Sequence, residues 1–237
     1  MGEGEVIREQ ISADPLSWTP EYRAGVIDLL GVLAYGELSA CQRMAADAAL
    51  APTLEDEVAL LSLVGNEFRH FTMLKARLEQ LGVSVNDAMT PFRAAIIGFH
   101  DHTAPSDWWE GLVKVYVGDG IATDFYREIA AYIDPDTQAV VLSVCADPGA
   151  SDYVIRRVRE GIAQDPRVAG RLALWGRRLV GEALSQAQRV AVDRDGLTHL
   201  LVGNVEQPGA DLAEIGRMLA RMTDAHAARM QTLGLSA

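Results

Sequence analysis

The feature of this sequence that most constrains its fold is the spacing of its apolar residues, which recur every three or four positions along most of the chain. Such spacing places apolar side chains on one face of a helix. No strand-type alternation extends beyond a few residues. We therefore expect an all-α protein. The longer helices are predicted at about residues 22–50, 53–81, 108–133, 137–163, 168–193 and 212–233.

The links between these helices indicate how they pack. Short links join the first helix to the second and the third to the fourth, and short links favour antiparallel hairpins. The longer segment 82–107, with a short helix at about 90–100, connects the two hairpins. Two hairpins and one long crossover describe a ferritin-like four-helix bundle. We expect one domain over residues 1–237, with the bundle at about 22–163 and two added C-terminal helices at about 168–235.

The charge of the chain bears on its partners. The net charge is −12 at pH 7, and an acidic surface repels the phosphate backbone of nucleic acids. The stretch 154–190 differs, because it holds eight arginines against three acidic residues, a local charge of +5. Two interpretations are open for this stretch, a pair of solvated helix faces or a dock for an anion or RNA. The arginines are Arg156, Arg157, Arg159, Arg167, Arg171, Arg177, Arg178 and Arg189.

Three features bear on the compartment. No uninterrupted apolar run approaches the roughly 20 residues that span a bilayer, so we expect no membrane partner. The start, MGEGEVIREQ, lacks the basic-then-apolar order of a secretory signal. Cys41 and Cys145 lie in helical patterns without metal-type spacing, which is typical of reduced core thiols. We expect a cytoplasmic protein.

Charged residues lie on two of the apolar stripes. Glu67 and His70 share a face with the leucines of the second helix, and Glu37 shares one with the apolar residues of the first. The turn between these helices centres near residue 52, about fifteen residues from both Glu37 and Glu67. In an antiparallel hairpin the two carboxylates therefore face each other at one level. Carboxylates in an apolar core are costly unless something positive lies between them.

The second hairpin repeats part of this pattern. Asp119 lies on the stripe of the third helix and Asp147 on that of the fourth, 28 residues apart, against 30 for Glu37 and Glu67. In di-iron carboxylate proteins, two helices each supply a Glu and the other two each supply a Glu-x-x-His motif. Carboxylate and imidazole ligands suit iron or manganese. The predicted metal ligands are Glu37, Glu67, His70, Asp119 and Asp147.

One expected ligand is absent, and several alternatives stay open. The second motif reads Asp147-Pro148-Gly149-Ala150, without an imidazole at Ala150. Asp147 before Pro148 also fits a helix N-cap, so the cap and ligand interpretations compete. The other candidates are Asp124 in place of Asp119 and Asp152 as a replacement ligand. Glu182 fits either a core-edge carboxylate bonded to an Arg or an outer partner of the site, and His226 favours a packed or capping role.

Four segments of the sequence resemble a known family. They are AYGELSA (34–40), NEFRHF (66–71), VYVGDGIATDFYREIA (115–130) and GRRLVGEALSQAQ (176–188). They are similar to the ferritin-like proteins related to the MiaE-type tRNA hydroxylase, and most to its actinobacterial branch, over about residues 20–235. The resemblance implies a non-haem di-iron centre that uses dioxygen to hydroxylate a modified adenosine in tRNA. It places a His where this chain has Ala150, so the second iron is in question.

Three functions follow, from different classes. The first is a dioxygen-using di-iron hydroxylase supplied with electrons by a separate protein, since no flavin or nicotinamide motif is present. The second is a metal-binding protein with a degenerate, mono-metal or non-catalytic site that holds iron or manganese. The third is a structural bundle whose acidic groups are capped or paired. The acidic charge favours a smaller substrate or a protein partner over tRNA, and a homo-oligomer is left open.

Overall fold

The computed structural model of the chain is all-helical in the residues that it describes, 11–146, 151–202 and 210–237. The α-helices are α2 (Pro20–Asp47), α3 (Leu54–Gln80), α4 (Val85–Met89), α5 (Arg93–His102), α6 (Trp108–Ile129), α7 (Pro135–Val144), α8 (Ser151–Gln164), α9 (Arg167–Asp193), α10 (Asp195–Val202) and α11 (Leu212–Leu233). Short 3₁₀ turns lie at Pro15–Ser17, Ala48–Leu50, Thr90–Phe92 and Ala130–Tyr132.

Polar side chains fix where the long helices begin. Thr19 accepts a hydrogen bond from the Tyr22 amide at the start of α2, and Thr53 accepts one from Asp56 at the start of α3. Such caps satisfy amides that have no partner within the helix. Helix α11 ends at Gly234, whose φ of +80° is a left-handed conformation that glycine adopts without strain.

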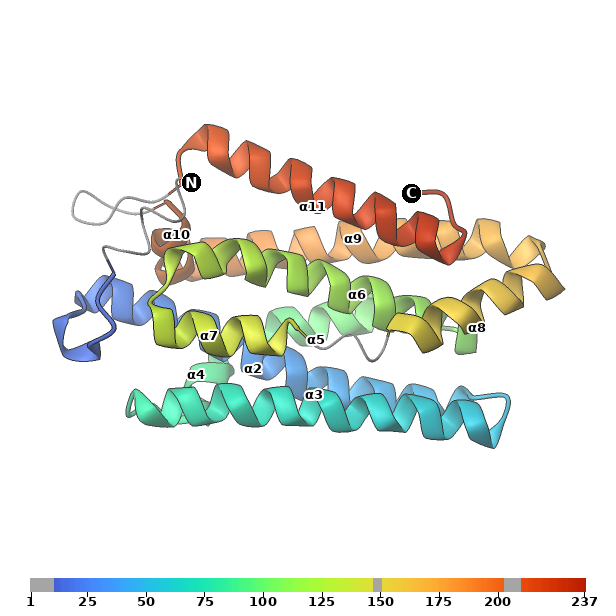
Figure 1. Ribbon diagram of the computed structural model, residues 1–237, viewed down its shortest axis with the longest axis horizontal. Coiled ribbons are helices and arrows are strands. Elements are labelled where there is room, and N and C mark those ends of the chain that lie inside the picture. Colours follow the sequence, from blue (N-terminus) through green and yellow to red (C-terminus); the bar gives the residue numbers. More distant parts are fainter. Residues whose placement is uncertain (1–10, 147–150, 203–209) are drawn as a thin grey trace.

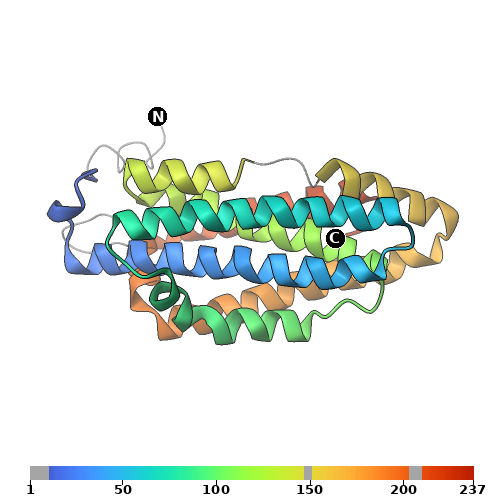
Figure 2. The ribbon, with the colours of Figure 1, turned by 90° about the horizontal axis from the view of Figure 1, so that it is seen from below.

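The helices form an elongated stack in which α6 is central. Helices α2 and α3 lie side by side as an antiparallel hairpin along one long side of the molecule (Figures 1 and 2). Helix α7 packs on α3 and α6, while α9 and α11 pack on α6 from its other side. The two C-terminal helices therefore lie on the far side of α6 from α7 and pack on α6 itself.

The fourth predicted helix, 137–163, is wrong as a single element. The structure has two helices there, α7 and α8, which share α6 as a neighbour but otherwise differ: α7 also packs on α3, and α8 also packs on α9 and α11. Between them the sequence contains Pro148 and Gly149, which disfavour a helix interior. Residues 147–150 lie outside the described part of the chain.

The apolar core has two parts. One part gathers the first half of α2, the second half of α3 and α7, with Leu30, Leu78 and Val141 among its members. The other gathers the second half of α2, the first half of α3 and the start of α6, together with side chains from α8, α9 and α11. Glu37, Glu67 and Asp119 occur at the level where α2, α3 and α6 pass from one part to the other.

Helix α2 combines length with an apolar composition. The segment Pro20–Leu50 is long and apolar enough to cross a membrane by length and composition. Most of its apolar window is buried inside the protein, and Asp28 and Glu37 on it are buried as well. A core helix enclosed by other helices has this composition.

Candidate metal centre

Two helices bring three potential metal ligands together. Glu37 comes from α2, and Glu67 and His70 come from α3. Each offers one ligand atom, and these atoms lie within 4.8 Å of one another. The Nδ1 atom of His70 is 3.5 Å from Oε2 of Glu37. The expected meeting of these side chains at one level of the hairpin is therefore what the structure shows.

The environment of this group is unfavourable for negative charge. Glu37 is buried, and burial is the largest cause that raises its pKa to about 7, while a hydrogen bond with Glu67 lowers it and the charge of Asp119 raises it. Oε2 of Glu37 is buried and makes no hydrogen bond within the described residues, since Nδ1 of His70 at 3.5 Å does not form one with it. A cation between the carboxylates would supply the missing partner, so the donor set fits a metal ion.

Asp119 adjoins the group from α6. It lines the same cavity as Glu67 and His70, and its side chain is exposed to that cavity although it lies deep in the protein. Burial, followed by the charge of Glu67, raises the pKa of Asp119 to about 7. His70, Arg229 and Arg127 act in the opposite direction. Asp119 is thus placed to join the site, next to the compact three-residue group.

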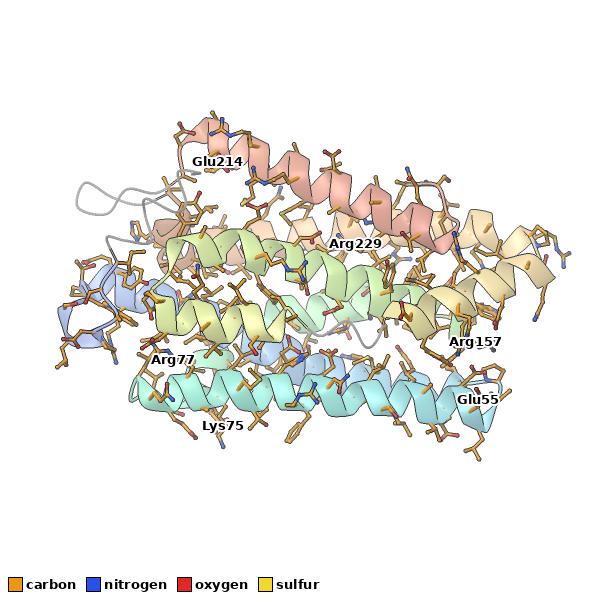
Figure 3. The ribbon with its side chains drawn as sticks, in the orientation of Figure 1. Glu55, Lys75, Arg77, Arg157, Glu214 and Arg229 are labelled. Carbon is orange, nitrogen blue, oxygen red and sulfur yellow. The ribbon has the colours of Figure 1, made fainter. Side chains whose placement is uncertain are left out.

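Asp124 has a different partner. Its Oδ2 accepts a hydrogen bond from Nη2 of Arg229, on α11, at 2.5 Å (Figure 3). This ion pair neutralises the carboxylate at the edge of the cavity. Of the two aspartates that the sequence left open on this helix, Asp119 is therefore the one that lies toward Glu67 and His70.

The structure does not add the remaining candidates to this group. Asp147 and Ala150 are outside the described residues, and Asp152 is exposed on α8. Oε1 of Glu182, which the sequence left open as an outer partner of the site, instead accepts hydrogen bonds from Nδ1 of His102 and Nε2 of Gln186, both at 2.7 Å. His226 is half-buried on α11, where burial and the charge of Arg229 lower its pKa.

A cavity of about 260 Å³ opens beside the group. Its walls combine apolar side chains with the acidic residues and two arginines. The lining includes Leu63, Glu67, His70, Val115, Tyr116, Asp119, Asp124, Arg127, Val144, Cys145 and Arg229. Arg127 donates a hydrogen bond to the carbonyl of Cys145 at 2.7 Å, which fixes it at the cavity edge. A small molecule bound here would lie against both the acidic group and an apolar wall.

Sequence reasoning missed Tyr126 as a neighbour of the site. It is a partly buried residue of α6, and burial raises the pKa of its phenol further above the usual value, with the charge of Glu37 as the next cause. A Cβ on Gly36 would lie 3.5 Å from the Tyr126 Oη atom, an ordinary van der Waals contact, so the phenol lies against α2 at the residue before Glu37. The signal was present, since Tyr126 lies two turns after Asp119 on the same stripe.

Comparison with known protein families gives a match over most of the chain. A family model described as "Ferritin-like domain, actinomycetes" matches residues 20–204. The matched region takes in α2 and α3, which hold Glu37, Glu67 and His70, and extends through α6 and α9 to α10. No match was found among the curated proteins.

Proposed function

The chain belongs to the ferritin-like domain family of actinomycetes, and from this premise we propose that it binds iron at Glu37, Glu67 and His70 and uses it in a dioxygen-dependent hydroxylation. The observation that carries the proposal is the buried Glu37 oxygen that makes no hydrogen bond within the described residues, beside a second carboxylate and an imidazole. Two carboxylates and one imidazole form a donor set suited to iron or manganese.

The residues of the chain have separate roles in this proposal. Glu37, Glu67 and His70 would hold one iron, Asp119 beside them would be a ligand of a second, and the bound irons would supply the activation of dioxygen. The Tyr126 phenol stays protonated because its pKa is raised, so it can donate a hydrogen bond beside Glu37. Leu63, Val115 and Val144 exclude water from one wall of the cavity.

The reaction requires a reductant that the chain does not contain. Hydroxylation of a C–H bond inserts one oxygen atom of dioxygen and releases the other as water, which consumes two electrons and two protons. We infer that a separate electron-donor protein supplies the electrons. A cavity of about 260 Å³ lies at or below the lower end of typical ligand pockets, which favours a small substrate over a nucleoside within folded tRNA. This preference departs from the MiaE-like activity that the sequence resemblance implies.

The second candidate is a mono-metal or non-catalytic protein of the same family. It is favoured by one observation, that the compact ligand group within the described residues comprises three side chains from two helices. Titration with Fe(II) without oxygen separates the candidates, since a di-iron hydroxylase takes up two equivalents and a mono-metal site takes up one. Uptake of no iron or manganese would leave a structural bundle and contradict both.

We predict that removing the imidazole depletes the metal. Protein purified without a chelator should contain iron or manganese by elemental analysis. The His70→Ala variant should contain several-fold less, because the metal ion loses its imidazole ligand. The matched control is His199→Ala, at an exposed position on α10. Metal-loaded protein should also consume dioxygen when a reductant is added. Unchanged metal content in His70→Ala would contradict the site, and absence of dioxygen consumption would contradict the hydroxylase while leaving the metal site standing.

A further inference from the structure

The outer side of α3 carries an exposed apolar stripe. Its members recur at intervals of four and three residues, so they lie along one face of the helix. They are Leu54, Val58, Leu61, Gly65, Phe68 and Thr72, all exposed. In Figure 1 this helix forms the lower edge of the molecule, and Figure 2 shows it from below, with no helix or turn of the described chain in front of it.

Two hydroxyl groups on and beside the stripe bond within α3. The hydroxyl of Ser62 donates to the Val58 carbonyl at 2.8 Å, and that of Thr72 donates to the Phe68 carbonyl at 2.9 Å. Both hydroxyls therefore bond within their own helix and require no water. The stripe extends over about 27 Å of helix, at 1.5 Å per residue. Its side chains are mostly apolar, and these two hydroxyls already have hydrogen-bond partners.

Gly65 at the middle of the stripe indicates a close approach. A Cβ built on it would meet nothing within 4 Å, so no contact inside the described chain explains the glycine. Glycine in a helix interior costs about 1 kcal/mol relative to alanine. A helix from outside that approaches closely at this point would account for the absent side chain, as small residues do wherever two backbones come near each other.

The stripe is complementary to itself when reversed. An antiparallel copy related by a two-fold axis near position 63 places Leu54 opposite Thr72 and Val58 opposite Phe68. It also places Leu61 opposite Gly65, so the leucine of each copy enters the space above the glycine of the other. We propose that the exposed face of α3 binds a second copy of this chain in an antiparallel, two-fold symmetric pair.

The charges beside the stripe match in this arrangement. Glu55 and Arg69 each follow a stripe residue by one position, so they lie on the same flank of α3. A two-fold reversal brings equal flanks of the two helices together and leaves Glu55 of one copy within two positions of Arg69 of the other. Each dimer gains two opposite-charge pairs in this way. A parallel pair of helices does not place these residues opposite each other.

The expected dimer is weak. One helix pair of this length buries less than the roughly 800 Å² per partner of a standard interface, so we expect a dissociation constant on the order of 10 μM. The net charge of −12 on each copy opposes association. At about 0.15 M salt the Debye length is about 8 Å, which screens the distant charges and leaves the local contacts dominant.

Sedimentation of the purified full chain over about 1–300 μM tests the pair. The Leu61→Glu variant should dissociate at least tenfold more readily, because it places a carboxylate at the centre of an apolar contact. The control is Leu174→Glu, at an exposed apolar position on α9, which should leave association unchanged. Since both sites are exposed in the monomer, both variants should fold, with unchanged circular dichroism as the check. A monomer throughout, or a dimer insensitive to Leu61→Glu, overturns the proposal and indicates another occupant or none.

A charge exchange tests the antiparallel arrangement. Glu55→Arg or Arg69→Glu alone should weaken the dimer about three- to tenfold, since each creates like charges across the two-fold axis. The double variant Glu55→Arg/Arg69→Glu should restore the wild-type dissociation constant, because opposite charges again face each other. Failure of the double variant to recover association contradicts the antiparallel pairing and overturns the proposal.

Discussion

At the scale of single residues, Glu37 is a buried carboxyl group, and in the metal-free fold its burial disfavours the charged form. Its pKa in the folded protein is about 7, against an ordinary value of 4.5. Between these values the folded protein holds a proton that the unfolded chain releases. Stability from this group is therefore present below about pH 4.5 and is lost as the pH rises through 7. A bound cation removes that loss because it stabilises the carboxylate.

This linkage predicts a pH-dependent effect of Glu37→Gln. In protein stripped of metal, the variant should be more stable than the wild type at pH 8, with an upper value of about 3 kcal/mol for a shift of this size, and the difference should shrink toward pH 5. Thermal unfolding over that range measures it. Manganese should stabilise the wild type at pH 8 and not the variant. A difference between the two proteins that does not change with pH contradicts the assignment.

The sequence could predict only those site residues whose positions follow from the apolar face of their own helix. Glu37, Glu67 and His70 share stripes with core residues on a hairpin with a short turn, so their level followed from counting. The partner of Glu182 did not follow, because His102 belongs to a helix that the crossover segment brings in from about 80 residues away. The ion pair between Asp124 and Arg229 depends in the same way on where α11 lies.

At the scale of elements, one buried ion pair ties three helices together. Nη2 of Arg77, on α3, is 3.1 Å from Oδ1 of Asp134, which caps α7. The Nε atom of Arg77 donates to the Thr137 hydroxyl, and the Asp134 amide donates to the Tyr22 hydroxyl on α2 at 2.7 Å. All four side chains are buried. Figure 3 shows Arg77 on the side of α3 that faces α7.

We predict that Arg77→Met lowers the free energy of unfolding by about 3–5 kcal/mol, because it leaves the buried Asp134 carboxylate without its partner. The matched control lies two residues away. Lys75 points to the solvent side of α3 and pairs with Glu79 at 3.5 Å (Figure 3), and Lys75→Met should change stability by less than about 1 kcal/mol. Chemical denaturation measures both. Equal effects of the two substitutions would show that Asp134 is held by other groups.

The apolar periodicity correctly predicted which long segments are helical, but it did not predict every point where one helix ends and the next begins. The apolar stripe runs through 137–163, and it predicts one helix where the structure has α7 and α8. The stripe continues because both helices bury a face, although against partly different neighbours. Helix α10 was missed because it begins only two residues after α9 ends, and its eight residues are too few for a periodic pattern to show.

At the scale of the whole molecule, the arginine-rich stretch offers less free positive charge than its number of arginines suggests. Arg157 bonds the buried Asp56 at 2.7 Å, with Tyr153 on the same carboxylate. Arg171 bonds Asp107 and Glu110 at 2.6 and 2.5 Å. These two arginines join α8 to α3 and α9 to α6, and the ion pairs neutralise their charges within the protein. The exposed arginines of the stretch include Arg156, Arg159 and Arg177.

This distribution predicts weak binding of tRNA. The stretch carries +5, which leaves −17 on the rest of the chain, and ion pairs inside the protein occupy part of the positive charge. A protein that neutralises several phosphates loses affinity steeply as salt rises. We expect bulk tRNA to bind weakly at low salt and not measurably at about 0.15 M salt. The measurement is a filter-binding or anisotropy series over salt concentration.

The choice of variant decides what this experiment means. A substitution of Arg157 would break the ion pair with Asp56 and unsettle α8, so lost binding could reflect lost structure. A variant with Arg156→Ala, Arg159→Ala and Arg177→Ala removes exposed charge instead and should leave thermal unfolding nearly unchanged. Submicromolar binding at about 0.15 M salt that this variant abolishes would contradict our preference for a small substrate and support the tRNA hydroxylase activity implied by the sequence resemblance. Binding that the variant retains would place any nucleic-acid contact outside the arginine-rich stretch.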